Sequence, residues 1–513
     1  MRVLESLTRE DLRDMNGGHI NLDGCGGFHY NGLARSPSLF GLMDFSALNF
    51  WLTLIPFLLL LALVNKCIGR DEASRRRNNR YFILLTSLTL LGIASTLTLL
   101  IFCLVAIVAY VICRAAEPLQ RGRRLILGLL IALLLLPLLY YKYGYFICSN
   151  LEPDRDWDTL RHLVIPIGIS FYTFQIIGFC IDTLIRRLPV PGFIDYMNFC
   201  SFFPQIVAGP IERRDDLLPQ VREMKLRPDE TSLVQGISYV ILGLFFKGCV
   251  ADNLAANFPG ARDVEQQSAY LLWLNNLSFT FRIYFDFAGY GLTAYGLGKC
   301  MGIKLRLNFL SPYTSTNVSE FWRRWHTSLT LWFRDYIYFP LGGSRTKRWA
   351  LNILIVFLIS GLWHGANWNF IVWGAVIGIT MIIHRIFRKR GHQLPSWAGW
   401  LLTFLCTVVI WMFFYEQDFS VIAARMQLMF RSDAYGIHHL AALVSEKEFA
   451  YLIAGALPPL LLSLLIIIAE AISQRRYEDP YRIFLNPWIV GLMVFMLTIY
   501  TPGVASPFIY FAF

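Results

Sequence analysis

Residues 81–113 read YFILLTSLTLLGIASTLTLLIFCLVAIVAYVIC, an apolar run without a charged side chain. A helix crosses the hydrocarbon core of a bilayer in about 20 residues, so this run is long enough to enter the membrane and return. Basic clusters flank it on both sides, at 75–80 and at 114–124. Because clustered Lys and Arg mark the cytoplasmic side, both ends belong on that side. The run therefore predicts two membrane helices joined by a tight turn.

The composition of the whole chain agrees with a membrane protein. Of its 513 residues, 56% are hydrophobic and 16% are charged, against about 45–50% and about 25% in soluble proteins. These values exclude the soluble, disordered and fibrous classes. The net charge of +11 would suggest nucleic acid in a soluble protein. Here the basic residues cluster between apolar runs, so the charge reflects membrane topology.

The other apolar runs predict the rest of the fold. We expect further crossings at 45–64, 125–148, 162–185, 232–251, 269–298, twice within 351–384, and at 397–415, 451–472 and 488–513. The fold class is an all-α polytopic integral membrane protein with about 11–13 transmembrane helices. Residues 193–210, interrupted by Pro204 and Gly209, predict a re-entrant segment. Residues 300–349 are too polar to span and predict interfacial helices.

Two further features bear on organisation and class. Residues 1–44 carry six acidic against four basic side chains and predict a loosely ordered, non-cytoplasmic tail before a membrane domain at 45–513. The ten cysteines form no CxxC pair and no Cys/His metal spacing. We therefore expect neither a metal site nor a disulfide framework, and we interpret the thiols as small buried side chains.

Two histidines are the strongest candidates for chemistry. His364 lies between the apolar stretches 351–362 and 371–383, and His326 follows two arginines and two tryptophans. A histidine at membrane depth needs a hydrogen-bond partner or a wet cavity, and burial favours its neutral form, which suits a general base. The equally open alternative for each is a histidine that packs between helices and bonds to a backbone carbonyl.

Five motifs give the chain a family resemblance. They are PIGISFYTFQ at 166–175, FWRRWH at 321–326, WFRDYIYFPLGG at 332–343, GLWHG at 361–365 and the terminal PFIYFAF at 507–513. In this order and spacing they resemble the membrane-bound O-acyltransferase family, and within it the alginate O-acetyltransferase branch of bacterial envelope enzymes. The resemblance runs from about residue 45 to the end of the chain, in line with a membrane domain at 45–513.

The resemblance implies a fold, an activity and partners. The helices would surround a central tunnel, with His364 as the catalytic residue and His326 as its partner across the tunnel. The enzyme would take an acetyl group from a cytosolic thioester, acetyl-CoA, with no bound cofactor. It would pass that group to a hydroxyl for O-acetylation of an exported or cell-surface polysaccharide, with a periplasmic or membrane-anchored partner protein. The location would be the bacterial inner membrane.

The same motifs supply further candidate residues. Four arginines near the expected cytoplasmic mouth could hold the phosphates of the donor: Arg323, Arg324, Arg334 and Arg345. The alternative for each is ordinary positive-inside charge. Five residues are expected to line the tunnel: Trp325, Asp335, Asp286, Trp363 and Asn367. For Asp335 we favour an ion pair with an arginine. For Asp286 we weigh a tunnel role against an ion pair with Arg282, one helical turn away.

Other functions remain as alternatives. The D-alanyl branch of the same family uses a carrier-protein thioester and modifies teichoic acid. The length of the chain and its polar insert at 416–448 favour the acetyl branch. A transporter for envelope glycans would predict repeated halves with broken helices, and a non-catalytic scaffold would tolerate loss of His326 and His364. The sequence does not select the polysaccharide acceptor.

Overall fold

The protein is described by a computed structural model over residues 45–67, 71–226, 228–257, 268–436, 455–503 and 506–511. Within these residues the regular structure is helical and there is no β-strand, which confirms the all-α class. The predicted tail at 1–44 lies outside the described residues.

Helices run through both halves of the chain. Those of the first half are α3 (Leu48–Cys67), α4 (Glu72–Ala94), α5 (Thr96–Ala116), α6 (Arg123–Leu138), α7 (Gly144–Leu151), α8 (Asp158–Arg161), α9 (Ile169–Leu184), α10 (Phe193–Ser201), α11 (Arg214–Glu223) and α12 (Glu230–Phe245). Those of the second half are α13 (Asp252–Asn257), α14 (Ala269–Cys300), α15 (Val318–Arg324), α16 (Thr327–Phe333), α17 (Trp349–His364), α18 (Trp368–Lys389), α19 (Ser396–Tyr415), α20 (Phe419–Phe430), α23 (Leu457–Tyr477) and α24 (Pro487–Tyr500). Three π-helical segments follow α6, α12 and α16, namely η2 (Leu139–Tyr143), η3 (Phe246–Ala251) and η6 (Arg334–Tyr338).

The helices identify a multi-pass membrane protein. Among the described residues, seven helices are long and apolar enough to cross a bilayer. Four more, α9, α17, α20 and α24, are apolar but shorter. The predicted crossings in α4 and α14 form helices of 23 and 32 residues. Neither meets the same test, because α4 opens with charged side chains and α14 carries buried polar ones. The number 11–13 stays a prediction.

The breaks between helices follow local sequence signals. Ser95 alone separates α4 from α5: its backbone is extended, with φ −166° and ψ 116°, and its side chain caps α5 at Thr98 N. Two helices with a tight turn were predicted for 81–113, and this is confirmed. Helix α10 has nine residues and is followed by buried turns, as expected of a re-entrant segment. The stretch 300–349 contains only short helices.

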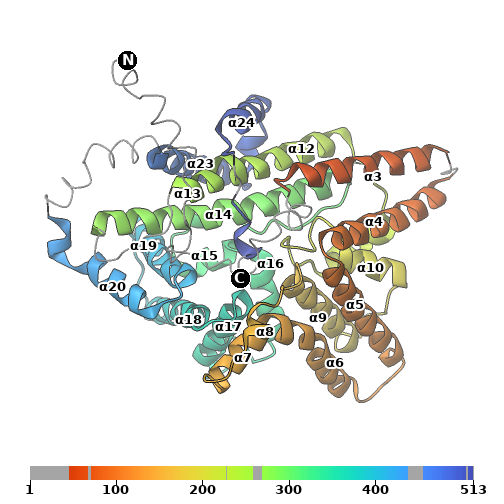
Figure 1. Ribbon diagram of the computed structural model, residues 1–513, viewed down its shortest axis with the longest axis horizontal. Helices are drawn as coiled ribbons and strands as arrows, with labels where there is room; N and C mark the ends of the chain where they lie inside the picture. Colours follow the sequence, from red (N-terminus) through yellow and green to blue (C-terminus); the bar gives the residue numbers. More distant parts are fainter. Residues whose placement is uncertain are drawn as a thin grey trace.

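Two long helices, α12 and α14, lie side by side across the molecule and organise it (Figure 1). Their close approach requires glycine, because a Cβ on Gly243 of α12 would lie 2.5 Å from Gly289 O of α14. Small residues allow such backbone contact in membrane proteins. Helices α4, α5, α6, α9 and α10 lie on one side below this pair, and α17–α20 lie on the other (Figure 1). The C-terminal segment ends near the centre, between the two groups.

Candidate active site

Both candidate histidines are placed by breaks in helices. His364 is the last residue of α17, before extended Gly365. His326 is the N-cap of α16 and takes up left-handed backbone angles, with φ 44° and ψ 56°. Such angles are uncommon for a residue with a side chain and occur where surrounding contacts enforce them. Thr327 N donates to Asn308 O (2.9 Å), which fixes the chain directly after His326.

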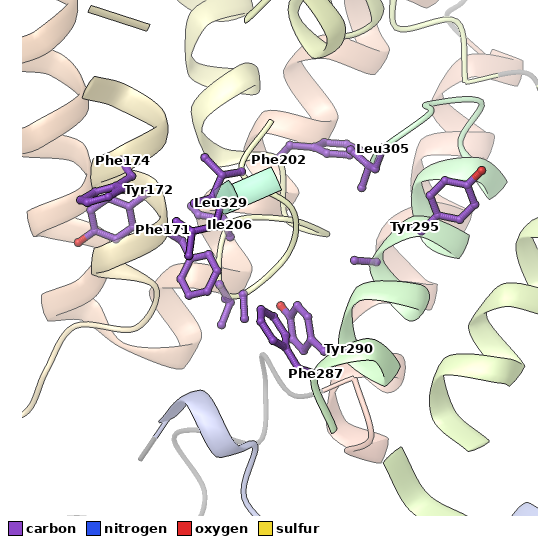
Figure 2. Close-up of a cluster of buried hydrophobic side chains, with 14 of the residues drawn as sticks. Phe171, Tyr172, Phe174, Phe202, Ile206, Phe287, Tyr290, Tyr295, Leu305 and Leu329 are labelled. Atoms are coloured by element: carbon purple, nitrogen blue, oxygen red, sulfur yellow. The ribbon is translucent and has the colours of Figure 1, made fainter. Parts of the chain in front are cut away.

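The two imidazoles lie in one cluster of packed aromatic side chains, which we call the chamber. His326 and His364 are 2% and 4% exposed, and the ring of Trp363 contacts both, with centroids 5.8 and 4.9 Å away. Phe287 of α14 packs edge-on against His326 at 4.7 Å. Figure 2 shows Phe287 and Phe171 of α9 pointing toward the same space. The structure therefore brings together the two histidines that the sequence singled out.

The C-terminal segment completes this chamber. The ring of Tyr510 lies 5.6 Å from His364 and 4.3 Å from Phe287. The segment is held by a buried charge cluster in which Lys247 Nζ pairs with Asp252 (2.7 Å) and Asp286 (2.9 Å). Asp286 also accepts a hydrogen bond from Ile509 N at 2.6 Å.

The histidine nitrogens are available for chemistry. Both ring nitrogens of His326, and Nδ1 of His364, are buried without a hydrogen-bond partner among the described residues. Buried polar atoms are normally paired, so these unpaired nitrogens mark positions that call for a functional explanation. Burial also lowers the pKa of His326 to about 3, so its imidazole is neutral at physiological pH.

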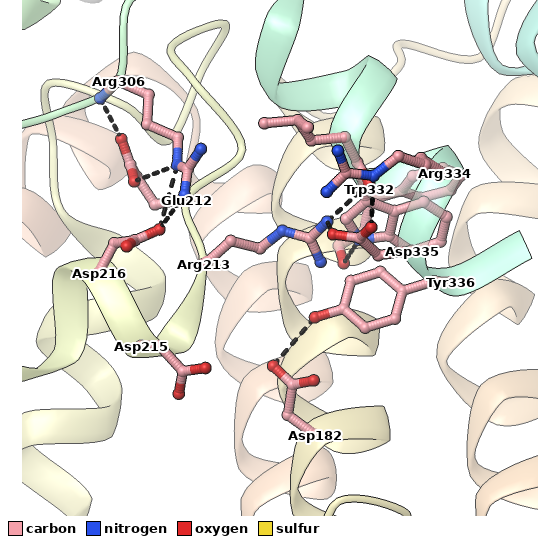
Figure 3. Close-up of polar contacts among 12 residues, drawn as sticks. Asp182, Glu212, Arg213, Asp215, Asp216, Arg306, Trp332, Arg334, Asp335 and Tyr336 are labelled. Atoms are coloured by element: carbon pink, nitrogen blue, oxygen red, sulfur yellow. Dashed lines mark hydrogen bonds and ion pairs between the residues drawn. The ribbon is translucent and has the colours of Figure 1, made fainter. Parts of the chain in front are cut away.

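A charged cavity of about 800 Å³ is lined in part by Thr327, the residue that follows His326 in the chain. The charged lining residues are Glu212, Asp215, Asp216, Lys304, Arg306, Arg323 and Arg334. Ion pairs occupy several of them (Figure 3). Arg306 N donates to Glu212 Oε1 (2.6 Å), and the Arg306 guanidinium pairs with Asp216. Among the described residues, the side chains of Lys304 and Arg323 have no carboxylate within ion-pair distance.

Only two of the four predicted donor arginines reach this cavity. Arg323 and Arg334 line it. Arg324 instead pairs with Glu320 (2.6 Å) on the same helix and donates to Thr314 Oγ1. Arg345 is exposed on the loop before α17 and does not line the cavity. Arg324 and Arg345 therefore lie outside this cavity, and their donor role stays a prediction.

Some of the residues predicted to line the tunnel lie beside the two histidines, and others do not. Trp363 lies in the chamber, whereas Trp325 packs between Phe309 and Trp411, with ring centroids 4.9 and 4.8 Å away. Asn367 caps α18 and donates to Gln417. These contacts give Trp325 and Asn367 packing and capping roles.

The two aspartates form ion pairs. Asp335 pairs with Arg213 (2.8 Å) and Arg334 (2.7 Å), as favoured from the sequence. The alternative pairing of Asp286 with Arg282 is wrong. Its partner is Lys247 on the neighbouring helical element, which a spacing rule within one helix does not detect.

Sequence reasoning missed three charged residues in apolar runs that a simple signal would have found. Lys142, Lys247 and Glu470 are each the single charged residue in the apolar runs 125–148, 232–251 and 451–472. A lone charge in a membrane segment is costly and marks a functional or strongly paired position. Glu212, Lys304 and Arg306, which line the cavity, lie in polar stretches and carried no such signal.

Two buried histidines with unpaired ring nitrogens, inside a multi-pass helical membrane protein, form a candidate site for acid–base chemistry. The sequence model of the MBOAT, membrane-bound O-acyltransferase family, matches residues 180–417. The chain is 35% identical over 358 residues to the peptidoglycan O-acetyltransferase of Helicobacter pylori, covering 63% of this chain and 67% of that protein. It is 34% identical over 367 residues to the probable alginate O-acetylase AlgI of Pseudomonas aeruginosa, covering 70% and 68%.

A lower similarity links the chain to the teichoic acid D-alanyltransferase of Bacillus subtilis, at 30% identity over 283 residues, 51% of this chain and 69% of that protein. The protein belongs to the membrane-bound O-acyltransferase family and is an acyltransferase. The resemblance carried by the five motifs is thereby confirmed.

Proposed function

We propose that the protein transfers an acetyl group from cytosolic acetyl-CoA to a hydroxyl of an exported or cell-surface polysaccharide. It would do so in the bacterial inner membrane, together with a periplasmic or membrane-anchored partner protein. The observation that carries the proposal is that His326 and His364 present buried nitrogens with no partner among the described residues, in a protein that also has a cavity lined by both basic and acidic side chains. The higher identity to relatives named for O-acetylation supports acetyl as the group.

His364 acts as the general base in this proposal. The acceptor oxygen attacks the thioester carbonyl while an imidazole nitrogen of His364 takes the hydroxyl proton. A carbon–oxygen bond forms, the carbon–sulfur bond breaks, and the proton passes from His364 to the leaving sulfur. Such general base catalysis contributes about 10²–10⁴-fold in rate. The neutral imidazole of His326 donates a hydrogen bond to the carbonyl oxygen as negative charge develops there.

The cavity serves the donor. Lys304 and Arg323, which have no carboxylate partner among the described residues, bind its phosphates, and Arg334 at the same wall adds positive charge. Glu212 is 3% exposed, and its Oε2 accepts no hydrogen bond from the described residues. Burial raises the pKa of the Glu212 carboxyl to about 8, so it is largely protonated at neutral pH. It therefore offers a hydrogen bond to the amide-rich arm of coenzyme A.

The decisive experiment compares ester-linked acyl groups on envelope polysaccharides by mass spectrometry in cells that make the wild-type chain or His364→Ala at equal levels. Loss of acetyl esters is expected, and it identifies the polymer. The matched control is His162→Ala, because His162 is half exposed and pairs with Asp158 away from the chamber. Loss of D-alanine esters would instead assign the protein to teichoic acid modification. Unchanged esters of every kind would refute the proposal.

A further inference from the structure

A lysine at membrane depth contacts the end of the helix that carries His364. Lys142 lies in the π-helical segment η2, and its Nζ donates to Trp363 O (2.8 Å) and His364 O (2.9 Å). A third, longer contact of 3.4 Å reaches Ser170 Oγ. The three donors of one ammonium group are thus directed at the last two residues of α17 and at α9.

These contacts complete the hydrogen bonding of the α17 terminus. The last four carbonyls of a helix have no partner within the helix and must find others. Gly361 O accepts from Gly365 N (3.3 Å) and Leu362 O accepts from Tyr143 Oη (2.5 Å). Lys142 satisfies the other two. Two consecutive residues of η2 therefore cap three carbonyls of α17, and π-helical segments are frequent at functional sites.

Capping of the α17 carbonyls does not by itself explain why residue 142 is a lysine and not a neutral hydrogen-bond donor. Among the described residues no carboxylate lies within ion-pair distance of Lys142, which is half-buried in an apolar run, so its charge has no counter-ion there. That arrangement is costly, and a neutral side-chain amide would also donate to carbonyls. The negative end of the α17 dipole favours a cation at this position, and a cation binds two carbonyls at once more strongly than a neutral donor.

We infer that Lys142 is a positioning residue for His364: its ammonium group fixes the last turn of α17 and thereby the imidazole. One of the two carbonyls it binds belongs to His364 itself, so a displacement of the cap moves the catalytic side chain directly. The inference rests on the proposed role of His364. A misplacement of about 1 Å in a catalytic group can lower the rate about 100-fold.

The test uses inverted membrane vesicles from the source cells, which retain the full chain with its natural acceptor. Radiolabelled acetyl-CoA is added outside, and ester-linked acetyl is measured against donor concentration. For Lys142→Met, which keeps the chain length but removes the donors, we expect kcat to fall about 10–100-fold with KM for acetyl-CoA changed less than about twofold. Lys142→Arg, which keeps charge and donors, should recover most of kcat.

Controls separate positioning from folding. Lys66→Met removes an exposed lysine from the last turn of α3 and should leave kcat unchanged. In a His364→Ala background, Lys142→Met should cause no further loss, because the residue that it positions is absent. If Lys142→Met does not fold, Lys142→Gln replaces the ammonium with a weaker neutral donor, and the same measurement should show a smaller fall in kcat; an unchanged kcat in that variant would refute the role of the charge.

An unchanged kcat in the neutral variant would refute the inference, and so would an equal loss in the His364→Ala background. If His364→Ala itself retains full activity, the proposed function fails instead.

Discussion

The charge cluster that holds the C-terminal segment allows a quantitative prediction. Lys247 is 6% exposed, and its partners Asp252 and Asp286 are each 2% exposed. Replacing Lys247 with Met leaves two buried carboxylates without their cation. Removing one partner of a buried ion pair typically costs about 3–5 kcal/mol. The same change removes the hydrogen bond from Lys247 Nζ to Ser506 O (2.7 Å), so we expect the C-terminal segment to detach.

The loss of folding free energy caused by Lys247→Met cannot exceed the free energy of protonating the carboxylates. That limit depends on pH, because a carboxylate that loses its cation can take up a proton. With a reference pKa of about 3.9, neutralising one aspartate costs about 4 kcal/mol at pH 7 and about 1.5 kcal/mol at pH 5. The destabilisation by Lys247→Met should therefore shrink on acidification. The assay is thermal unfolding of the detergent-solubilised full chain at both pH values, together with the rate at which carboxypeptidase removes the C-terminal residues.

A neutral triple variant provides the control. Lys247→Met combined with Asp252→Asn and Asp286→Asn has no unpaired charge, and replacing all members of a buried ionic set is often close to neutral in stability. We expect this variant to recover much of the lost thermal stability. The reasoning is refuted if Lys247→Met unfolds at the wild-type temperature with unchanged carboxypeptidase resistance, or if the triple variant is less stable than the single one.

Further predictions concern the cavity and the helix pair. Arg323→Ala should raise the KM for acetyl-CoA about tenfold, because a charge-assisted contact is lost. Arg345→Ala should leave this KM unchanged. An equal rise in KM for both variants in vesicle assays would contradict the donor site. Because burial raises the pKa of Glu212 to about 8, the unfolded chain releases this proton at lower pH than the folded protein does. Glu212 therefore lowers stability progressively between about pH 4.5 and pH 8, and Glu212→Gln should raise the unfolding temperature more at pH 8 than at pH 5; a pH-independent gain would exclude this account. Gly243→Ala should destabilise the protein by about 1–3 kcal/mol, because the new Cβ would lie 2.5 Å from Gly289 O, and unchanged thermal unfolding would show that α12 and α14 can separate at little cost.

Much of the fold follows from the lengths of apolar runs. The turn at Ser95 was predictable because 81–113 is too long for one crossing and has basic residues at both ends. The short helices of 300–349 followed from alternating arginines and aromatic side chains. The sequence did not predict which helices pack together, because that depends on contacts such as the one between Gly243 and Gly289.

The sequence also indicated only part of the candidate site, because it shows residue types and spacing but not contacts between distant segments. His364 was singled out because polar groups are rare at membrane depth, and His326 because it follows two arginines and two tryptophans at an expected membrane interface. The donor role of Arg324 stays a prediction, although its i,i+4 spacing from Glu320 already indicated the ion pair that the structure shows. Lys142 carried a signal of its own, a single charge in an apolar run, but its role depends on carbonyls more than 200 residues away.

The lengths of α17 and α24 have a consequence for the surrounding lipid. With 16 and 14 residues they are about 24 and 21 Å long at 1.5 Å per residue, against a hydrocarbon core of about 30 Å. Leu492, Phe495 and Ile499 of α24 are exposed, as expected of a surface that contacts lipid. If these two helices cross the membrane as the sequence predicts, the bilayer must thin around them, at a cost of fractions of a kcal/mol per ångström of mismatch. Lipid chain length thus becomes a variable that acts on the helix ending at His364, and longer acyl chains should oppose the geometry in which the enzyme works.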